Sequence, residues 1–261
     1  MDYGYSGDAA GSAPVVETPV GEALIADALV IEPQSQVVGT LQGRPPSVVA
    51  RTSERPLEAS LRRAGGVLTS LAALVLTAPL LLIIAAAIRL ESPGPAIFRQ
   101  ERVGKGGRRF TFYKFRGMYV DARDRWPELY EYRYGPKEIA HLRFHPEADP
   151  RVTRVGRWIR KTSIDELLNF WNVLKGDMAL VGPRPEIPEM LPYYGEHTVT
   201  VLSVKPGVTS IAKVTGRDEL TFGETLRLDV EYVEKRSLAL DLKILWATVR
   251  TVVRQHGVLP G

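Results

Sequence analysis

The chain has 261 residues, 44% hydrophobic and 25% charged, an ordinary balance for a globular protein of one or two domains. A formal net charge of +4 is too small to indicate nucleic-acid binding by itself. The absence of cysteine excludes disulfides, thiolate nucleophiles and cysteine-ligated metals.

Residues 1–60 are rich in Gly, Pro, Ser, Ala and acidic residues, and no amphipathic period persists through them. Such a composition is typical of a flexible tail that cannot bury a core. We therefore interpret residues 1–60 as a flexible N-terminal tail and assign no function to it.

The next segment, Ala64–Ile88, contains no charged residue and is long enough to be a membrane segment. Pro79 lies just past its middle, where it removes one backbone hydrogen bond and predicts a kink. Both flanks are basic, and the positive-inside rule places basic flanks in the cytoplasm. A hairpin over residues 61–91 that enters and leaves by the same membrane face satisfies both flanks. A kinked helix that crosses the membrane is the alternative.

Residues 96–116 are expected to form a β-hairpin. Ala96–Val103 and Arg109–Arg116 read as strands, and Gly104–Gly107 as the turn between them. The second strand alternates basic and aromatic residues, a pattern also found on nucleic-acid-binding faces. Beside a membrane segment, a phosphate-bearing lipid is the preferred ligand.

Two adjacent carboxylates, Asp165 and Glu166, stand at the start of an apolar helical pattern. Ser163 and Glu166 have the spacing of a capping box, which predicts a helix that starts at Ser163. Asp165 would then lie in the first turn, where the helix dipole and free N–H groups attract anions. Acidic residues at this position usually serve only as caps, so the pair alone does not establish catalysis.

Four other features of the sequence have recognisable patterns. Asp121–Leu142 and Leu220–Lys235 are predicted to be charged helices. A helical stripe from Leu238 to Val252 would pack in the core or lie on the membrane surface. Arg184 has a proline on each side, which would hold its guanidinium as a fixed bidentate donor for phosphate.

Taken together and in this order, these motifs resemble the bacterial sugar transferase family, the monotopic phosphoglycosyl transferases. The resemblance covers about Leu61 to Gly257. Its parts are the proline-broken membrane segment, Ser-Pro-Gly-Pro (92–95), Phe-Arg-Gln-Glu-Arg-Val-Gly (98–104), Tyr-Lys-Phe-Arg (113–116), the run 160–166, Trp-Asn-Val-Leu-Lys-Gly-Asp-Met (171–178), Leu-Val-Gly-Pro-Arg-Pro (180–185), Val-Lys-Pro-Gly-Val-Thr (204–209) and Leu-Asp-Leu-Lys-Ile (240–244).

The resemblance implies transfer of a sugar phosphate from a UDP-sugar to a polyprenyl phosphate such as undecaprenyl phosphate, at the cytoplasmic face of the bacterial inner membrane, with release of UMP. It implies that Asp165 is a nucleophile that forms a covalent phosphosugar intermediate, and that Glu166 with Asp165 holds Mg²⁺. It further implies five substrate-binding residues: Lys114, Arg116 and Arg184 belong to the phosphate and nucleotide site, and Arg160 and Asp241 match positions that shape the site.

Two positions depart from the family pattern. Gly117 stands where a serine is usual, and Ser-Ile-Ala-Lys (210–213) stands where Gly-Leu-Trp-Gln is frequent. The second departure leaves the choice of sugar and part of the acceptor site open. A catalytically inactive membrane-anchored scaffold is the alternative function, although such a protein is expected to have lost Asp165 or Glu166.

The resulting expectation is an α+β protein whose mostly helical catalytic head, residues 92–261, carries a small β-hairpin and is anchored by a proline-kinked re-entrant membrane helix. Its expected partners are a UDP-sugar, a polyprenyl phosphate and the lipid bilayer, with no nucleic acid. The oligomeric state stays open, with a homodimer as one arrangement compatible with the sequence.

Overall fold

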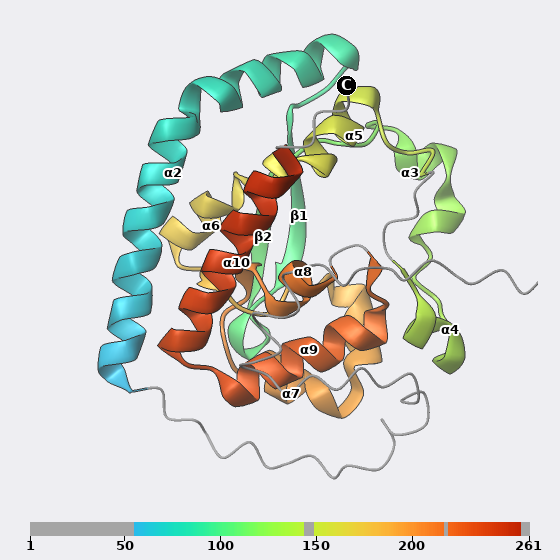
Figure 1. Ribbon diagram of the computed structural model, residues 1–261. Helices are drawn as coiled ribbons and strands as arrows, with labels where there is room; N and C mark the ends of the chain where they lie inside the picture. The colour runs from blue at the N-terminus through green and yellow to red at the C-terminus, as the bar shows by residue number, and fades with distance from the viewer. Residues whose placement is uncertain (1–54, 144–148, 217–218, 257–261) are drawn as a thin grey trace, which may run out of the picture. The chain divides into compact units, whose positions relative to one another are not determined.

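The computed structural model describes residues 55–143, 149–216 and 219–256. Within them the chain is α+β and mostly helical, as predicted (Figure 1). The helices are α2 (Pro56–Glu91), α3 (Ala122–Arg125), α4 (Pro136–His141), α5 (Arg154–Lys161), α6 (Asn169–Lys175), α7 (Thr198–Val201), α8 (Ile211–Thr215), α9 (Phe222–Lys235) and α10 (Leu238–His256). Most of the predicted tail, residues 1–54, lies outside the described residues, and its last residues begin α2.

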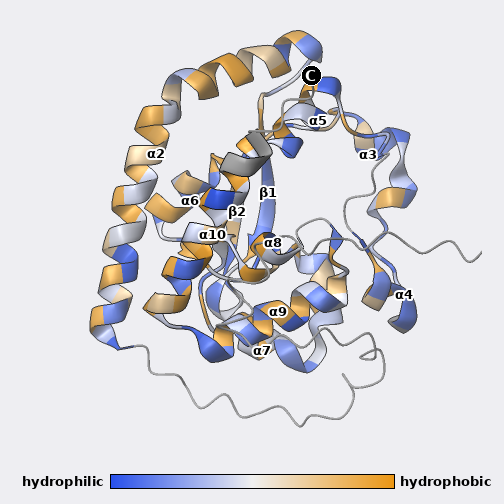
Figure 2. Cartoon of the chain, viewed as in Figure 1, coloured by the Kyte–Doolittle hydropathy of each residue, from blue (hydrophilic) through white to orange (hydrophobic). Residues whose placement is uncertain are grey.

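Helix α2 is 36 residues long and holds Pro79 inside its C-terminal half. It is the one helix in the described residues that is long and apolar enough to cross a membrane. Its ribbon bends within that half (Figure 1), and its residues are mostly hydrophobic between the N-terminal turns and the hydrophilic C-terminal end (Figure 2). Thr77 Oγ donates to the carbonyl of Ala73 at 2.6 Å, a side-chain bond of the kind that accompanies helix bending. The predicted kink is therefore present.

Both ends of α2 contact the rest of the described chain. Near its start, Arg62 donates to the Asp241 carboxylate of α10 at 2.6 Å, and Arg63 donates to the carbonyls of Val173 and Leu174 at the end of α6. Near its end, Ile84 and Ile88 are buried against β2 and α5. Arg62 and Arg63, which form the basic flank before the apolar segment, thus also hold α2 against α6 and α10.

The predicted β-hairpin is confirmed. Strands β1 (Ile97–Val103) and β2 (Arg109–Phe115) pair antiparallel, with Ile97 opposite Phe115 and Val103 opposite Arg109. The turn uses Gly106 and Gly107 with positive φ, a backbone region that favours glycine. A second, parallel pair joins β3 (Ala179–Val181) to β4 (Gly207–Thr209).

The prediction of one helix over Asp121–Leu142 is wrong. That segment forms α3, the 3₁₀ turn η2 (Pro127–Tyr130) and α4. Pro127 and Pro136 each occupy the first position of a new element, where a proline is tolerated because its missing N–H would have no partner. Helix α4 packs against α9, and Ile139 and Phe222 share one buried cluster there.

Most of the C-terminal stripe predicted on α10 faces outward, since Leu242, Val249 and Val252 are exposed, while Leu238 and Leu245 are half-buried. The buried face of α10 consists of Leu240, Asp241, Ile244 and Ala247 instead. Of the two placements left open by the sequence, core packing of this stripe is therefore wrong.

Candidate active site

The carboxylate pair lies in a short 3₁₀ turn, η3 (Ile164–Glu166), between α5 and α6. The predicted helix start at Ser163 is wrong, because α6 begins at Asn169 and Ser163 makes no capping hydrogen bond. An N-cap residue normally has extended backbone angles, whereas Ser163 has φ +58° and follows the end of α5. Asp165 and Glu166 are therefore presented by a tight turn and not by the first turn of an α-helix.

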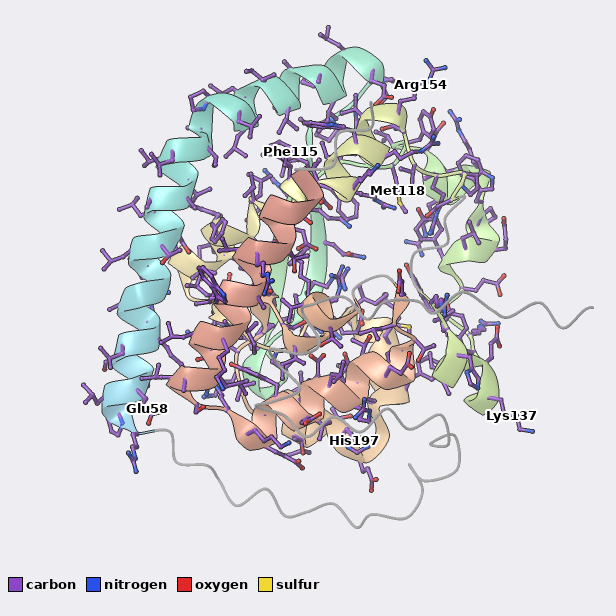
Figure 3. The ribbon with its side chains drawn as sticks, in the orientation of Figure 1. Glu58, Phe115, Met118, Lys137, Arg154 and His197 are labelled. Atoms are coloured by element: carbon purple, nitrogen blue, oxygen red, sulfur yellow. The ribbon has the colours of Figure 1, made fainter. Side chains whose placement is uncertain are left out.

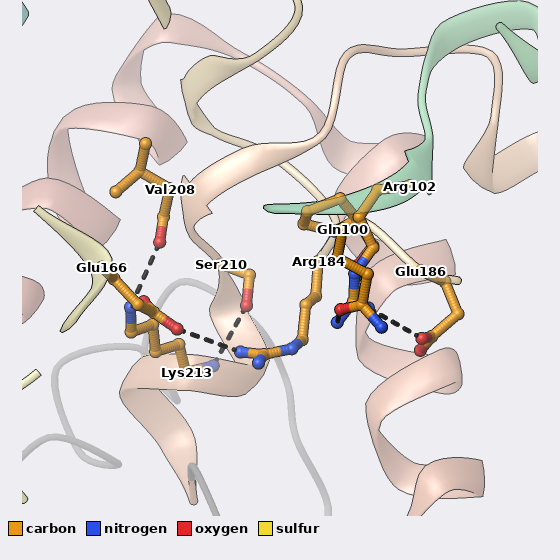
Figure 4. A network of polar contacts seen from close by, with 9 residues as sticks. Gln100, Arg102, Glu166, Arg184, Glu186, Val208, Ser210 and Lys213 are labelled. Atoms are coloured by element: carbon orange, nitrogen blue, oxygen red, sulfur yellow. Dashed lines mark hydrogen bonds and ion pairs between the residues drawn. The ribbon is translucent and has the colours of Figure 1, made fainter. Parts of the chain in front are cut away.

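Two cations hold the Glu166 side chain in place (Figure 4). Arg184 Nη1 lies 3.4 Å from Glu166 Oε1, and Lys213 Nζ contacts Glu166 Oε2. Lys213 Nζ also donates to the Val208 carbonyl at 3.2 Å, and its backbone N–H donates to Ser210 Oγ at 3.1 Å. Two separate parts of the chain, the loop that carries Arg184 and the helix α8 that carries Lys213, therefore converge on Glu166.

The pair is electrostatically asymmetric. Burial raises the pKa of Asp165, and the Glu166 charge raises it further, to about 6 against the opposing effects of Lys114, Arg160 and Lys213. Burial alone would raise the pKa of Glu166, but Lys213 and Arg184 outweigh it and hold that pKa well below its ordinary value. At neutral pH both groups are therefore ionised, and Asp165 is the more basic of the two.

Four cationic side chains act on this pair: Lys114, Arg160, Arg184 and Lys213. Burial, together with the charges of Arg102 and Arg160, lowers the pKa of Lys114 to about 7. With Lys114 protonated, positive charges exceed negative ones by two. An excess of this size among these six groups is favourable for a ligand with about two negative charges, such as a diphosphate diester.

The Pro-Arg-Pro loop is fixed by β1. Arg102 donates to the Pro185 carbonyl at 3.0 Å and to Glu186 Oε1 at 3.1 Å, and the backbone of Val103 donates to that of Glu186 at 2.9 Å. These bonds set the backbone around Arg184, whose side chain keeps 44% of its surface exposed. Arg184 is therefore a pre-positioned guanidinium at an open edge of the site.

The structure gives Arg116 a different environment from the one predicted. Its side chain is buried and donates to the carbonyls of Ile88, Ser92 and Pro93 and to Ser92 Oγ, at 2.6 to 3.2 Å. These acceptors lie at the C-terminal end of α2 and in the Ser-Pro-Gly-Pro turn after it. Figure 3 shows this region around Phe115 and Arg154. The guanidinium therefore caps a helix end here, and Arg116 is not among the cations that act on the carboxylate pair.

Asp241 is likewise engaged within the fold. Its carboxylate accepts hydrogen bonds from Arg62 at 2.6 Å and from the Tyr232 hydroxyl at 2.7 Å. Tyr232 OH also lies 3.2 Å from the carbonyl of Val181, which places Asp241 behind β3. Through its bonds to Arg62 and Tyr232, Asp241 holds α2, α9 and α10 together, which is a structural role. Of the predicted ligands, the structure brings Lys114, Arg160 and Arg184 together with the carboxylate pair.

Sequence reasoning missed two contributors, Lys213 and Arg102. The signal for Lys213 was its place in the Ser-Ile-Ala-Lys departure from the family pattern. The signal for Arg102 was its place in the hairpin strand that faces the Pro-Arg-Pro loop. Neither carries a local motif that would assign a role.

The two carboxylates supply oxygen ligands of the type that Mg²⁺ binds. Among the described residues, no third His, Asp, Glu or Cys joins them to complete a protein-only metal site. Mg²⁺ usually takes one or two carboxylates and completes its shell with water and substrate phosphates. The donor set therefore fits a metal that binds together with a phosphate-bearing substrate.

Comparison with known proteins gives the family. The undecaprenyl-phosphate galactose phosphotransferase of Salmonella typhimurium is 36% identical to this chain over 197 residues. These residues make up 76% of this chain and 41% of that relative. The galactosyl transferase CpsE of Streptococcus agalactiae is 46% identical over 63% of this chain and 36% of its own length. The chain thus spans about two fifths of the length of these two relatives.

A shorter relative matches over most of its length. The uncharacterized sugar transferase EpsL of Bacillus subtilis is 42% identical over 182 residues, which are 70% of this chain and 82% of EpsL. The family model described as bacterial sugar transferase matches residues 57–255, which include α2 and both carboxylates. The chain therefore belongs to the bacterial sugar transferase family.

Proposed function

We propose that this protein transfers a sugar-1-phosphate from a UDP-sugar to a polyprenyl phosphate, releases UMP, and so initiates the assembly of an exopolysaccharide, capsule, O-antigen or related glycoconjugate. The observation that carries the proposal is the half-buried Asp165–Glu166 pair, on which four cationic side chains act. Relatives named as undecaprenyl-phosphate sugar phosphotransferases support the same substrates.

Asp165 is the proposed nucleophile. Its carboxylate oxygen attacks the phosphorus that bears the sugar, and the bond from that phosphorus to the bridging oxygen breaks, so that UMP leaves with that oxygen. An oxygen of the acceptor phosphate then attacks the same phosphorus. This second step forms the polyprenyl diphosphate sugar and restores the Asp165 carboxylate.

The pKa of about 6 suits this role, because the carboxylate is largely ionised at neutral pH without a separate general base. Lys114, Arg160 and Arg184 are proposed to contact the phosphates and offset the repulsion between an anionic nucleophile and an anionic substrate. Glu166 is proposed to hold Mg²⁺ with Asp165, and a bound Mg²⁺ would neutralise charge on the diphosphate. Turnover should therefore be lost on chelation with EDTA and return on addition of Mg²⁺.

We further propose that α2 is a re-entrant membrane hairpin, with the tail and the catalytic head both in the cytoplasm at the inner membrane. The contacts at its two ends support this topology. Arg62 and Arg63 bond to the same head that Ile84 and Ile88 pack against, and a straight span would separate these two ends by the full membrane thickness.

The topology is testable because the chain has no cysteine. Single cysteines at the exposed positions Ser60 and Pro95 flank the segment without disturbing the Arg116 contacts. An impermeant maleimide should label neither in intact cells and both after lysis. Labelling of only one cysteine in intact cells would mean that α2 crosses the membrane.

An inactive membrane-anchored scaffold is the competing function. Purified protein in lipid nanodiscs, given a panel of UDP-sugars and undecaprenyl phosphate, should release UMP with at least one donor. The Asp165→Asn variant should fold and remain in the membrane but release none. A wild-type protein that releases no UMP with any donor, while remaining folded, would favour the scaffold.

A further inference from the structure

We propose that Lys213 competes with the divalent cation for Glu166, so that this chain binds that cation more weakly than it would with a neutral residue at position 213. The inference deepens the proposed function and rests on it in taking Glu166 as a metal ligand.

Both oxygens of Glu166 already face a cation. Lys213 Nζ contacts Oε2, and Arg184 Nη1 lies 3.4 Å from Oε1. The Lys213 side chain is only 20% exposed and is tied at a second point to the Val208 carbonyl. The lysine is thus held at the carboxylate by the fold, in contrast to a surface lysine that reaches it only occasionally.

The backbone explains why Lys213 stays there. Ser210 caps α8 by accepting the backbone N–H of Lys213, and Ile211 and Ala212 beside it are buried. This places the side chain of Lys213 toward η3, as Figure 4 shows. A metal ion that approaches Glu166 must displace Lys213 or bind next to its ammonium group.

Either event costs affinity. Even with the dielectric screening of bulk water, removal of one positive charge about 5 Å from a divalent ion tightens binding by about tenfold or more. A glutamine at position 213 removes this repulsion and frees Oε2. The lysine, for its part, supplies positive charge at the carboxylate when no metal is bound.

The test measures Mn²⁺ binding, by electron paramagnetic resonance or calorimetry, to the full-length protein in lipid nanodiscs without substrate. Mn²⁺ is a suitable probe because it takes the same oxygen ligands as Mg²⁺. Lys213→Gln should lower the Mn²⁺ Kd by about tenfold or more. Lys213→Met, which keeps the aliphatic stem, should do the same, and Lys213→Arg should leave the Kd near that of the wild type.

Two controls locate the effect. Lys235→Gln removes a lysine that also pairs with an acid, Glu231 at 2.9 Å on α9, and should not change the Kd. The double variant Lys213→Gln with Glu166→Gln should lose the gain, because the ligand itself is gone. Melting temperatures show whether each variant is folded.

An unchanged Kd in both Lys213→Gln and Lys213→Met would overturn the inference. So would a gain that persists in the double variant, or the absence of Mn²⁺ binding in wild type and variants alike. The outcome is separate from the proposed reaction: a protein that shows the gain but releases no UMP with any UDP-sugar would contradict the proposed function and leave this inference in place.

Discussion

Replacement of Arg116 by methionine is expected to destabilise the protein strongly and to leave donor recognition in the folded fraction largely unchanged. The substitution keeps an unbranched apolar stem but removes the guanidinium, and with it the hydrogen bonds to four acceptors. Ile88 O retains the Ser92 N–H as a donor and Pro93 is exposed to water, so the buried carbonyl and hydroxyl oxygens of Ser92 are the two acceptors that lose most. An orphaned buried acceptor costs about 1–3 kcal/mol, which gives roughly 3 kcal/mol for the pair.

For a protein of this size, 1 kcal/mol corresponds to about 2–4 °C in melting temperature, so Arg116→Met should melt about 6–12 °C lower. Differential scanning fluorimetry in nanodiscs measures this, and steady-state kinetics measures the donor KM. Arg108→Met, in the exposed hairpin turn, is the matched control and should melt within about 2 °C of the wild type. A wild-type melting temperature together with a raised donor KM would refute the structural role and restore Arg116 as a nucleotide ligand.

Three further variants or conditions have definite expected outcomes. Arg184→Lys should lower kcat/KM for the UDP-sugar about tenfold, because a point charge replaces a planar fork; wild-type kinetics would exclude Arg184 from the site. Since the ionised form of Asp165 is active and its pKa is about 6, kcat/KM should fall about tenfold per pH unit below pH 6; a limb that begins near pH 4 instead would contradict the burial of this group. Burial raises the pKa of Asp229 to about 8, so this carboxyl keeps a proton in the folded wild type that it loses near pH 4 in the unfolded chain. The free energy of unfolding of the wild type should therefore fall by about 1.4 kcal/mol for each pH unit between pH 4 and pH 8. The melting-temperature difference between Asp229→Asn and wild type should therefore rise over this window and level off above pH 8, and a difference that does not depend on pH would refute the assignment.

Sequence patterns correctly predicted the elements whose geometry is set by residues that are neighbours in the chain. The hairpin follows from alternation on either side of a glycine turn, and the bend in α2 follows from Pro79. Both were correct because the responsible residues are neighbours in the chain. The helix start at Ser163 failed for a related reason: the capping-box spacing is a local signal, but the left-handed backbone of Ser163 is imposed by the end of the preceding helix.

Contacts between distant residues could not be read in this way. Lys114 and Arg116 are two residues apart, and alternation in a strand would place them on one face. Strand β2 ends at Phe115, so Arg116 turns to the end of α2 while Lys114 stays at the site. Lys213 reaches Glu166 across a sequence separation of 47 residues. No spacing rule predicts such a contact, because it depends on how β4 and α8 pack against η3.

The most direct test of the proposed mechanism is the mass of the peptide that contains Asp165. Wild-type protein in nanodiscs receives a productive UDP-sugar and Mg²⁺ without any polyprenyl phosphate, and is then digested and analysed by mass spectrometry. The mechanism predicts release of at most one UMP per protein and the added mass of one sugar phosphate on that peptide. The Asp165→Asn variant should show neither UMP release nor the added mass. If no adduct forms and UMP is released only when both substrates are present, Asp165 is not a covalent nucleophile and the central proposal is wrong.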